Sequence, residues 1–116
     1  MDSITTATEK LIFEFATALV EGEYQRAHEL LSDSARDKWP PSLLRNSYQG
    51  MVGYFEAPPA FVAVEHVMND WPDKKPTDIG WAYASIYSEE EGEGVTVVVC
   101  AEKERYTIRE IEWGRP

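Results

Sequence analysis

Three short β-strands in a row, between residues 80 and 114, constrain the fold of this 116-residue chain more than any other feature. Their predicted ranges are 81–88, 95–102 and 105–113. In the first strand Trp81, Tyr83, Ser85 and Tyr87 alternate with Ala82, Ala84 and Ile86. Because successive side chains of a strand point to opposite faces, one face is predicted to be large and amphipathic and the other small and apolar.

The second strand is apolar at both parities, which is typical of a strand covered on both sides. In the third strand the apolar positions change parity, from Tyr106 and Ile108 to Ile111 and Trp113. This change predicts a β-bulge, a twist, or a strand that serves two environments. The acidic stretch 88–94 predicts a hairpin loop, in which two glycines are expected to supply positive φ. The connection at residues 103–104 contains no residue that favours positive φ, so its turn type is left open.

The first half of the chain has helical periodicity. A helix is predicted over residues 3–21, with Ile12, Phe15 and Leu19 among the residues on its apolar face. Its start has two alternatives, a capping box formed by Thr6 and Glu9, or a cap at residue 2 or 3. Gly22 suits the left-handed position after the helix. A second helix is predicted over residues 23–31, and residues 32–34 either break it or start another turn.

Two prolines after Trp39 predict a boundary, beyond which Ser42 can cap a third helix over residues 43–54. A strand is predicted over residues 61–71, with Val62, Val64, His66 and Met68 on one side. A proline-punctuated loop follows over residues 71–78. Helices followed by strands predict an α+β fold, in which N-terminal helices pack on a curved antiparallel sheet of about four strands.

Length and composition limit the organisation and the function. At 116 residues the chain is expected to form one domain, residues 1–116. A formal net charge of −10 disfavours nucleic-acid binding. Neither a signal peptide nor an apolar run long enough to cross a membrane is recognised. The single cysteine, Cys100, cannot form an internal disulfide and fits a reducing compartment, so a cytoplasmic location is expected.

The pattern around the end of the first predicted helix resembles a known superfamily. It reads Phe15-Ala16-(x)2-Leu19-(x)2-Gly22-Glu23-Tyr24-(x)2-Ala27-(x)2-Leu30-Leu31, and the ending Ile108-Arg-Glu-Ile-Glu-Trp113 is similar to the superfamily's last strand. Both resemble NTF2-like, cystatin-type cone domains, here a small bacterial-type variant. The resemblance implies a long helix wrapped by a curved antiparallel sheet, with a conical cavity. Its members include enzymes, transport factors, protein-partner modules and many homodimers.

Three residues are candidates for catalysis, namely His28, His66 and Asp70. A histidine or a carboxylate in a cone cavity would suit a lyase or isomerase of the superfamily. His28 lies one helical turn after Tyr24, so the two could touch. Asp70 near Tyr54 would form a carboxylate–phenol pair. Each of these groups is also explained by an ordinary structural role. With two histidines and one cysteine, no metal site and no cofactor are expected.

The aromatic residues with polar tips form the second candidate set, because such side chains line cavities and interfaces as well as cores. The set consists of Tyr24, Tyr48, Tyr54, Trp81, Tyr83 and Tyr87. These residues favour a non-enzymatic domain that binds a protein partner, or its own copy as a homodimer, through the sheet face. A small-molecule carrier or cavity enzyme, binding a small apolar ligand, is the alternative. The acidic run 89–93 is interpreted as a solvated loop.

Overall fold

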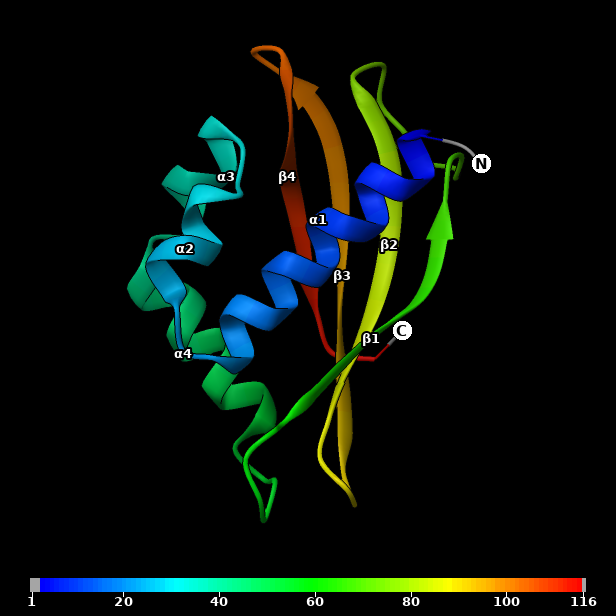
Figure 1. The fold of residues 1–116 in the computed structure, drawn as a ribbon. Coiled ribbons are helices and arrows are strands. Elements are labelled where there is room, and N and C mark those ends of the chain that lie inside the picture. The colour runs from blue at the N-terminus through cyan, green and yellow to red at the C-terminus, as the bar shows by residue number, and fades with distance from the viewer. Residues whose placement is uncertain (1–2, 116) are drawn as a thin grey trace.

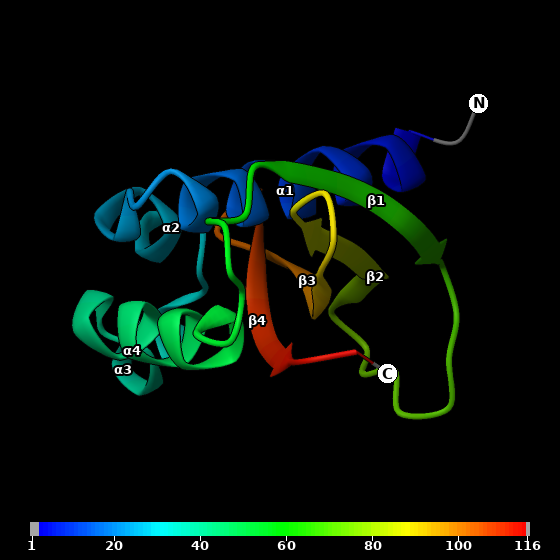
Figure 2. The same cartoon turned by 90° about the horizontal axis from the view of Figure 1, so that it is seen from below.

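The structure, a computed structural model, describes residues 3–115, which form helices first and strands afterwards (Figure 1). The helices are α1 (Ser3–Val20), α2 (Tyr24–Glu29), α3 (Asp33–Lys38) and α4 (Pro41–Val52). The strands are β1 (Phe61–Met68), β2 (Asp78–Tyr87), β3 (Gly92–Glu102) and β4 (Arg105–Trp113). They form one sheet in the order β1-β2-β3-β4, and every neighbouring pair is antiparallel. The predicted α+β class is confirmed: the sheet is curved and does not close (Figure 2).

Helix α1 lies across one face of the sheet and packs mainly on β2 and β1 (Figures 1 and 2). Its apolar stripe of Ile12, Phe15 and Leu19 is fully buried there. Burying each of these side chains stabilises the fold by about 1.5–3 kcal/mol. The helix is already formed at Ser3, so the predicted capping box at Thr6 and Glu9 is wrong. The alternative cap at Asp2 lies outside the described residues.

Three short helices follow and cover the β4 side of the sheet. Gly22 adopts a φ of 75° and ends α1, as predicted. Ser32 starts another helix rather than a simple break, because its hydroxyl accepts a hydrogen bond from the N–H of Ala35 at 3.2 Å and caps α3. Helix α4 begins at Pro41, so Ser42 is inside the helix and the predicted cap is wrong. Proline suits this first position because its missing N–H would have no helical partner.

The sheet has three register shifts, and those in β4 and β1 bear directly on the predicted strand faces. In β4 the register shifts between the partners of Val98 and Val99, which leaves Arg109 as the extra residue and confirms the predicted bulge. In β1 a second shift lies between Val64 and His66. Because of it Val67, rather than His66, follows Val62 and Val64 toward the core. The prediction that His66 and Met68 share that face is therefore wrong, and β1 ends at Met68 rather than at residue 71.

Positive φ angles occur in the β3–β4 turn and not, as predicted, at the glycines of the β2–β3 loop. Among the described glycines only Gly22 and Gly114 have positive φ, so Gly92 and Gly94 do not form the turn and instead belong to β3. Conversely, Lys103 and Glu104 both adopt left-handed conformations, with φ of 50° and 64°, at the β3–β4 turn. Two such residues in succession are the geometry of a type I′ turn, which matches the twist of the strands.

A buried ion pair joins β2 to β4 across β3. The carboxylate of Asp78 accepts hydrogen bonds from Nε and Nη2 of Arg109 at 2.6 and 2.7 Å, and from the N–H of Lys75 at 2.8 Å. The side chain of Asp78 is fully buried. Burial opposes ionisation, but the bonds from Arg109 and Lys75 outweigh it, so the pKa of Asp78 lies below its ordinary value. The residue that the bulge adds to β4, Arg109, is therefore the charge partner of the buried Asp78.

Between residues 3 and 115, no helix combines the length and the apolar character needed to cross a bilayer.

Candidate functional site

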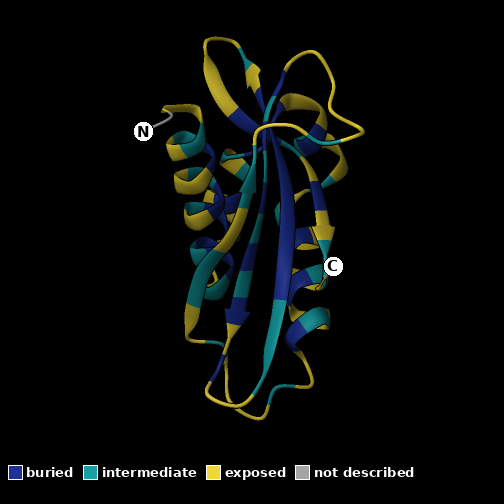
Figure 3. Ribbon diagram, turned by 90° about the vertical axis from the view of Figure 1, so that its right-hand side faces the viewer, coloured by how far each residue is buried: buried dark blue, intermediate teal, exposed yellow. Residues whose placement is uncertain are grey.

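Among residues 3–115, no helix covers the sheet face opposite α1 (Figure 3). Strand β2 determines its character. Ala82, Ala84 and Ile86 are fully buried on the helix side, whereas the alternate residues of β2 are only partly buried. Those alternate residues are Trp81, Tyr83, Ser85 and Tyr87, as the sequence predicted. The amphipathic face of β2 is therefore the uncovered one.

Strand β1 adds two rings to this face, Phe61 by its alternation with Val62 and His66 because of the bulge. Phe61, which is 47% exposed, stacks on Tyr87 with ring centroids 5.2 Å apart. His66 meets Trp81 edge-on at 5.9 Å. We call the group Phe61, His66, Trp81, Tyr83 and Tyr87 the aromatic face. Phe61 was missed from the sequence, although its place opposite Tyr87 follows once the two strands are paired.

Tyr83 lies flat across the neighbouring strand, over Gly94. A Cβ atom at Gly94 would come within 2.2 Å of the Tyr83 hydroxyl, so only glycine leaves room for the ring. Burial is the main cause that raises the pKa of the Tyr83 phenol; Arg115 lowers it, whereas Glu93 and Glu65 raise it further. The phenol is therefore protonated at neutral pH and can donate a hydrogen bond.

An open hollow of about 390 Å³ lies beside Tyr83 and Tyr87 on this face. Its lining residues are Ala63, Glu65, Tyr83, Ser85, Tyr87, Gly92, Glu93 and Arg115. Within it the hydroxyl of Ser85 donates to the Glu65 carboxylate at 2.7 Å. Polar tips, half-buried rings and fixed hydrogen bonds are together the composition of a recognition surface rather than of a closed core.

The surroundings of the aromatic face are acidic. Glu65 and Glu93 line the hollow beside Tyr83, and Glu110 and Glu112 stand on β4 opposite Val98 and Thr96. Arg115 lies near Glu93, with 3.9 Å between Nε and the carboxylate. Carboxylates thus outnumber the guanidinium groups here, in keeping with the net charge of −10.

The candidate catalytic residues do not converge. His66 belongs to the aromatic face and is exposed, and Asp70 is exposed beyond the end of β1. His28 is half-buried on α2, where its Nε2 contacts the carbonyl oxygen of Arg36 at 3.2 Å and ties α2 to α3. The hydroxyl of Tyr24 accepts a hydrogen bond from Gln49 at 3.4 Å. Each of the four thus has a separate environment.

The remaining predicted tyrosines also lie away from the aromatic face. Tyr48 is 5% exposed on the inner side of α4, and its hydroxyl has no hydrogen-bond partner among the described residues. Burial, with a smaller effect of Tyr24, raises the pKa of Tyr48 to about 12. Tyr54 is exposed and donates to the Glu93 carboxylate at 2.9 Å. A carboxylate–phenol pair therefore exists, but with Glu93 rather than with Asp70.

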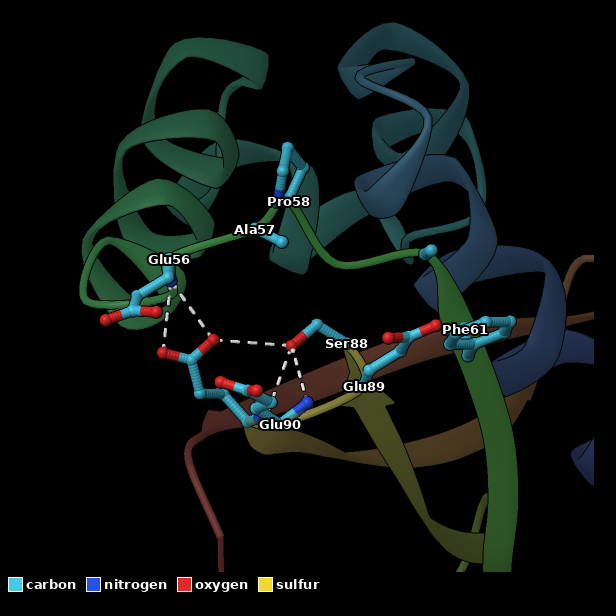
Figure 4. A pocket seen from close by; sticks show the side chains of 9 residues that line it. Glu56, Ala57, Pro58, Phe61, Ser88, Glu89 and Glu90 are labelled. Carbon is cyan, nitrogen blue, oxygen red and sulfur yellow. Dashed lines mark hydrogen bonds between the residues drawn. The ribbon is translucent and has the colours of Figure 1, made fainter.

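A second hollow, of about 460 Å³, lies at one end of the molecule, between the α4–β1 connection and the β2–β3 loop (Figure 4). The Glu91 carboxylate accepts from the N–H of Glu56 at 3.0 Å, and the Ser88 hydroxyl accepts from the N–H of Glu91 at 3.1 Å. Glu89 and Glu90 are exposed, as expected of a solvated loop. Glu91 departs from that expectation, because it fastens the loop to the helical side.

Cys100 is buried, and its thiol contacts the Thr107 hydroxyl at 3.4 Å. Burial is the main cause that raises the pKa of the thiol, so it is protonated and unreactive at neutral pH. Within residues 3–115, no group of three or more histidine, cysteine or acidic side chains is arranged to hold a metal ion.

The chain matches no protein-family model and no curated protein.

Proposed function

We propose that this protein is a non-enzymatic recognition module, which binds another protein through the aromatic face. One observation carries the proposal: Trp81, Tyr83 and Tyr87 share one face of β2 with Ser85, and among residues 3–115 no helix covers that face of the sheet. Tyrosine and tryptophan are enriched at the centres of protein interfaces because each buries a large area at a small cost in side-chain entropy. The scattered environments of His28, His66 and Asp70 support recognition rather than catalysis.

Charge favours a different protein over a second copy as the partner. Face-to-face pairing of two copies would bring Glu65, Glu93, Glu110 and Glu112 toward the same set on the other copy. Like charges brought together at an interface cost several kcal/mol. A basic partner would meet the same carboxylates favourably. Self-association through this face, the homodimer that the aromatic residues also favoured, is therefore the weaker form of the proposal.

Membership in the NTF2-like superfamily is part of the proposal. Its support is the order of elements: a long helix, a short helix opening with Tyr24, and an antiparallel sheet that ends in β4. The interior between α1 and the sheet is filled by side chains such as Phe15 and Leu19. We therefore propose a variant in which the outside of the sheet, and not a cone cavity, carries the function.

The test starts with a partner isolated from the source cells with the tagged protein, identified, and purified for titration calorimetry. Tyr87→Glu should weaken its binding at least about tenfold, because it removes an aromatic ring from the interface, and the loss of such an anchor costs about 2 kcal/mol or more. Phe13→Glu is the matched control: Phe13 is an exposed aromatic residue on α1, 47% exposed against 37% for Tyr87. If Phe13→Glu abolishes binding and Tyr87→Glu does not, the assigned surface is wrong.

Small-molecule binding on the helix side is the second candidate, and one observation favours it. The Tyr48 hydroxyl and Trp113 Nε1 are both buried, and neither finds a partner among the described residues. If nothing binds there, Tyr48→Phe should leave stability unchanged or raise it by up to about 1 kcal/mol, because it removes an unpaired polar group. A loss of more than about 1 kcal/mol in urea unfolding would instead favour an internal ligand or water.

A further inference from the structure

A small hollow of about 120 Å³ lies on the same sheet face as Tyr83, at the end nearer the β1–β2 loop. It is distinct from the larger hollow beside Tyr87, with which it shares no lining residue. Its lining residues are Trp71, Asp73, Trp81, Thr96, Val98, Glu110 and Glu112. Four separate segments contribute to it: the β1–β2 loop, β2, β3 and β4.

The lining combines aromatic surface with negative charge. Trp71 and Trp81 supply half-buried indole rings, and Thr96 and Val98 form a base that is only 5% and 3% exposed. Asp73, Glu110 and Glu112 surround it with carboxylates, of which Glu110 is 60% exposed at its side chain. A cation over an indole ring is attracted by the π-electrons, and adjacent carboxylates add to that attraction.

The cationic side chains near the hollow do not neutralise its carboxylates. Arg109 is 3.7 Å from the Glu110 carboxylate, but it is bound in two hydrogen bonds to Asp78. The Lys74 ammonium is 5.7 Å from the ring centre of Trp71, while it donates to the carbonyl oxygen of Asn69 at 2.6 Å. Lys74 thus shows that an indole of this hollow accepts an ammonium group in the folded protein.

From this geometry we infer that the partner inserts a lysine or arginine side chain between Trp71 and Trp81. The inference rests on the proposed function and names the chemistry of its partner, a basic protein surface. The volume of the hollow, about 120 Å³, suits the ammonium or guanidinium group of a single side chain. The acidic surroundings select against a neutral or anionic side chain at this point.

The test uses single amino acids as probes, so that no partner has to be known. Nα-acetyl-lysine methylamide and its arginine counterpart are titrated into the ¹⁵N-labelled protein, and the indole N–H signals are followed by NMR. Both cations should shift the Trp71 and Trp81 signals saturably, in the millimolar range. The norleucine counterpart, which has no charge, should not. Trp39 and Trp113, which pack on each other at 5.7 Å, serve as internal controls without a shift.

A carboxylate pair supplies the second arm of the test. Glu110→Gln combined with Glu112→Gln should weaken the binding of both cations at least about threefold, because the substitutions remove two carboxylates that attract the bound cation. Glu9→Gln combined with Glu21→Gln, exposed positions on α1 and just after it, is the matched control and should change nothing. The absence of a saturable shift, an equal response to norleucine, or insensitivity to the Glu110 and Glu112 substitutions would overturn the inference.

The two proposals fail separately. If Tyr87→Glu abolishes partner binding but the cationic probes do not shift the indole signals, the aromatic face is supported as an interface and the cation subsite is refuted. If Tyr87→Glu leaves partner binding unchanged, the proposed interface is refuted, irrespective of the NMR result with the cationic probes.

Discussion

At the scale of single residues, two glycines in the sheet permit close contacts rather than turns. Gly94 makes room for the Tyr83 ring, and Gly80 makes room for Thr8, whose Oγ1 would lie 2.2 Å from an added Cβ. The sequence could not distinguish these uses, because a glycine near a strand end serves equally for positive φ or for close approach. The side chain that each glycine accommodates, Thr8 or Tyr83, lies elsewhere in the chain, so only the folded structure reveals it.

Gly94→Ala should destabilise the protein by about 1–3 kcal/mol, because the added methyl group collides with the Tyr83 ring. The measurement is urea unfolding. In a double-mutant cycle with Tyr83→Ala, the cost of Gly94→Ala should largely vanish, since the obstructing ring is gone.

Gly50→Ala is the matched control for this substitution. A Cβ at Gly50 meets no atom within 4 Å, and the position lies inside α4. Alanine there should stabilise the protein by about 0.5–1 kcal/mol through helix propensity. A Gly94→Ala protein as stable as the wild type would contradict the packing of Tyr83 described above.

At the scale of elements, the features that depend on a strict alternation of side chains along a strand were predicted correctly. The alternation in β2 identified the uncovered face correctly, because residues two apart must share a face. The switch from Ile108 to Ile111 predicted the β4 bulge. Val64 and Val67 in β1 have the same three-residue spacing, but the alternation of His66 and Met68 with them concealed it. As a result the ring contact between His66 and Trp81 was not foreseen.

The Asp78–Arg109 pair shows a further limit of sequence reasoning, because its members are 31 residues apart and meet only through the register of three strands. Removing Arg109 would leave the buried Asp78 carboxylate without its charge partner. Arg109→Met should therefore cost about 3–5 kcal/mol at pH 7. This magnitude exceeds the effect expected from any exposed ion pair of the chain.

The pH dependence of that cost has a definite sign. The folded-state pKa of Asp78 is depressed in the wild type, so its stabilisation is present above the unfolded pKa of about 3.9 and is lost as the pH falls through the folded value. In Arg109→Met the acid form of Asp78 is favoured instead. The stability gap between the two proteins, measured by urea unfolding, should shrink on going from pH 7 to below about pH 4. A gap that widens in acid would refute this account.

Glycine substitutions in the β3–β4 turn should raise the stability of the protein. Glu104 occupies a left-handed conformation that costs a non-glycine residue about 1 kcal/mol or more. Glu104→Gly should stabilise the protein by roughly 0.5–1 kcal/mol in urea unfolding. Lys103→Gly should give a smaller gain, because Lys103 also pairs with Asp33. Destabilisation by Glu104→Gly would show that the turn is not of the type described.

At the scale of the whole molecule, charge and architecture act together. The helices cover one face of the sheet (Figure 3), and the aromatic residues of the other face are partly exposed beside acidic side chains. A net charge of −10 accelerates the approach of a basic partner and repels a second copy, more strongly at low ionic strength. Composition alone indicated the acidity, but its concentration around Trp81 and Tyr83 depends on how β3 and β4 pair.

The most direct test of the central claim, that the uncovered face is the binding surface, is cross-saturation NMR on the complex with the isolated partner. The account predicts that saturation passes from the partner to the side chains of Trp81, Tyr83, Tyr87 and Phe61, while α1 signals such as Phe13 stay unaffected. Saturation transfer confined to the helices, with none to the four rings of the sheet, would contradict the account.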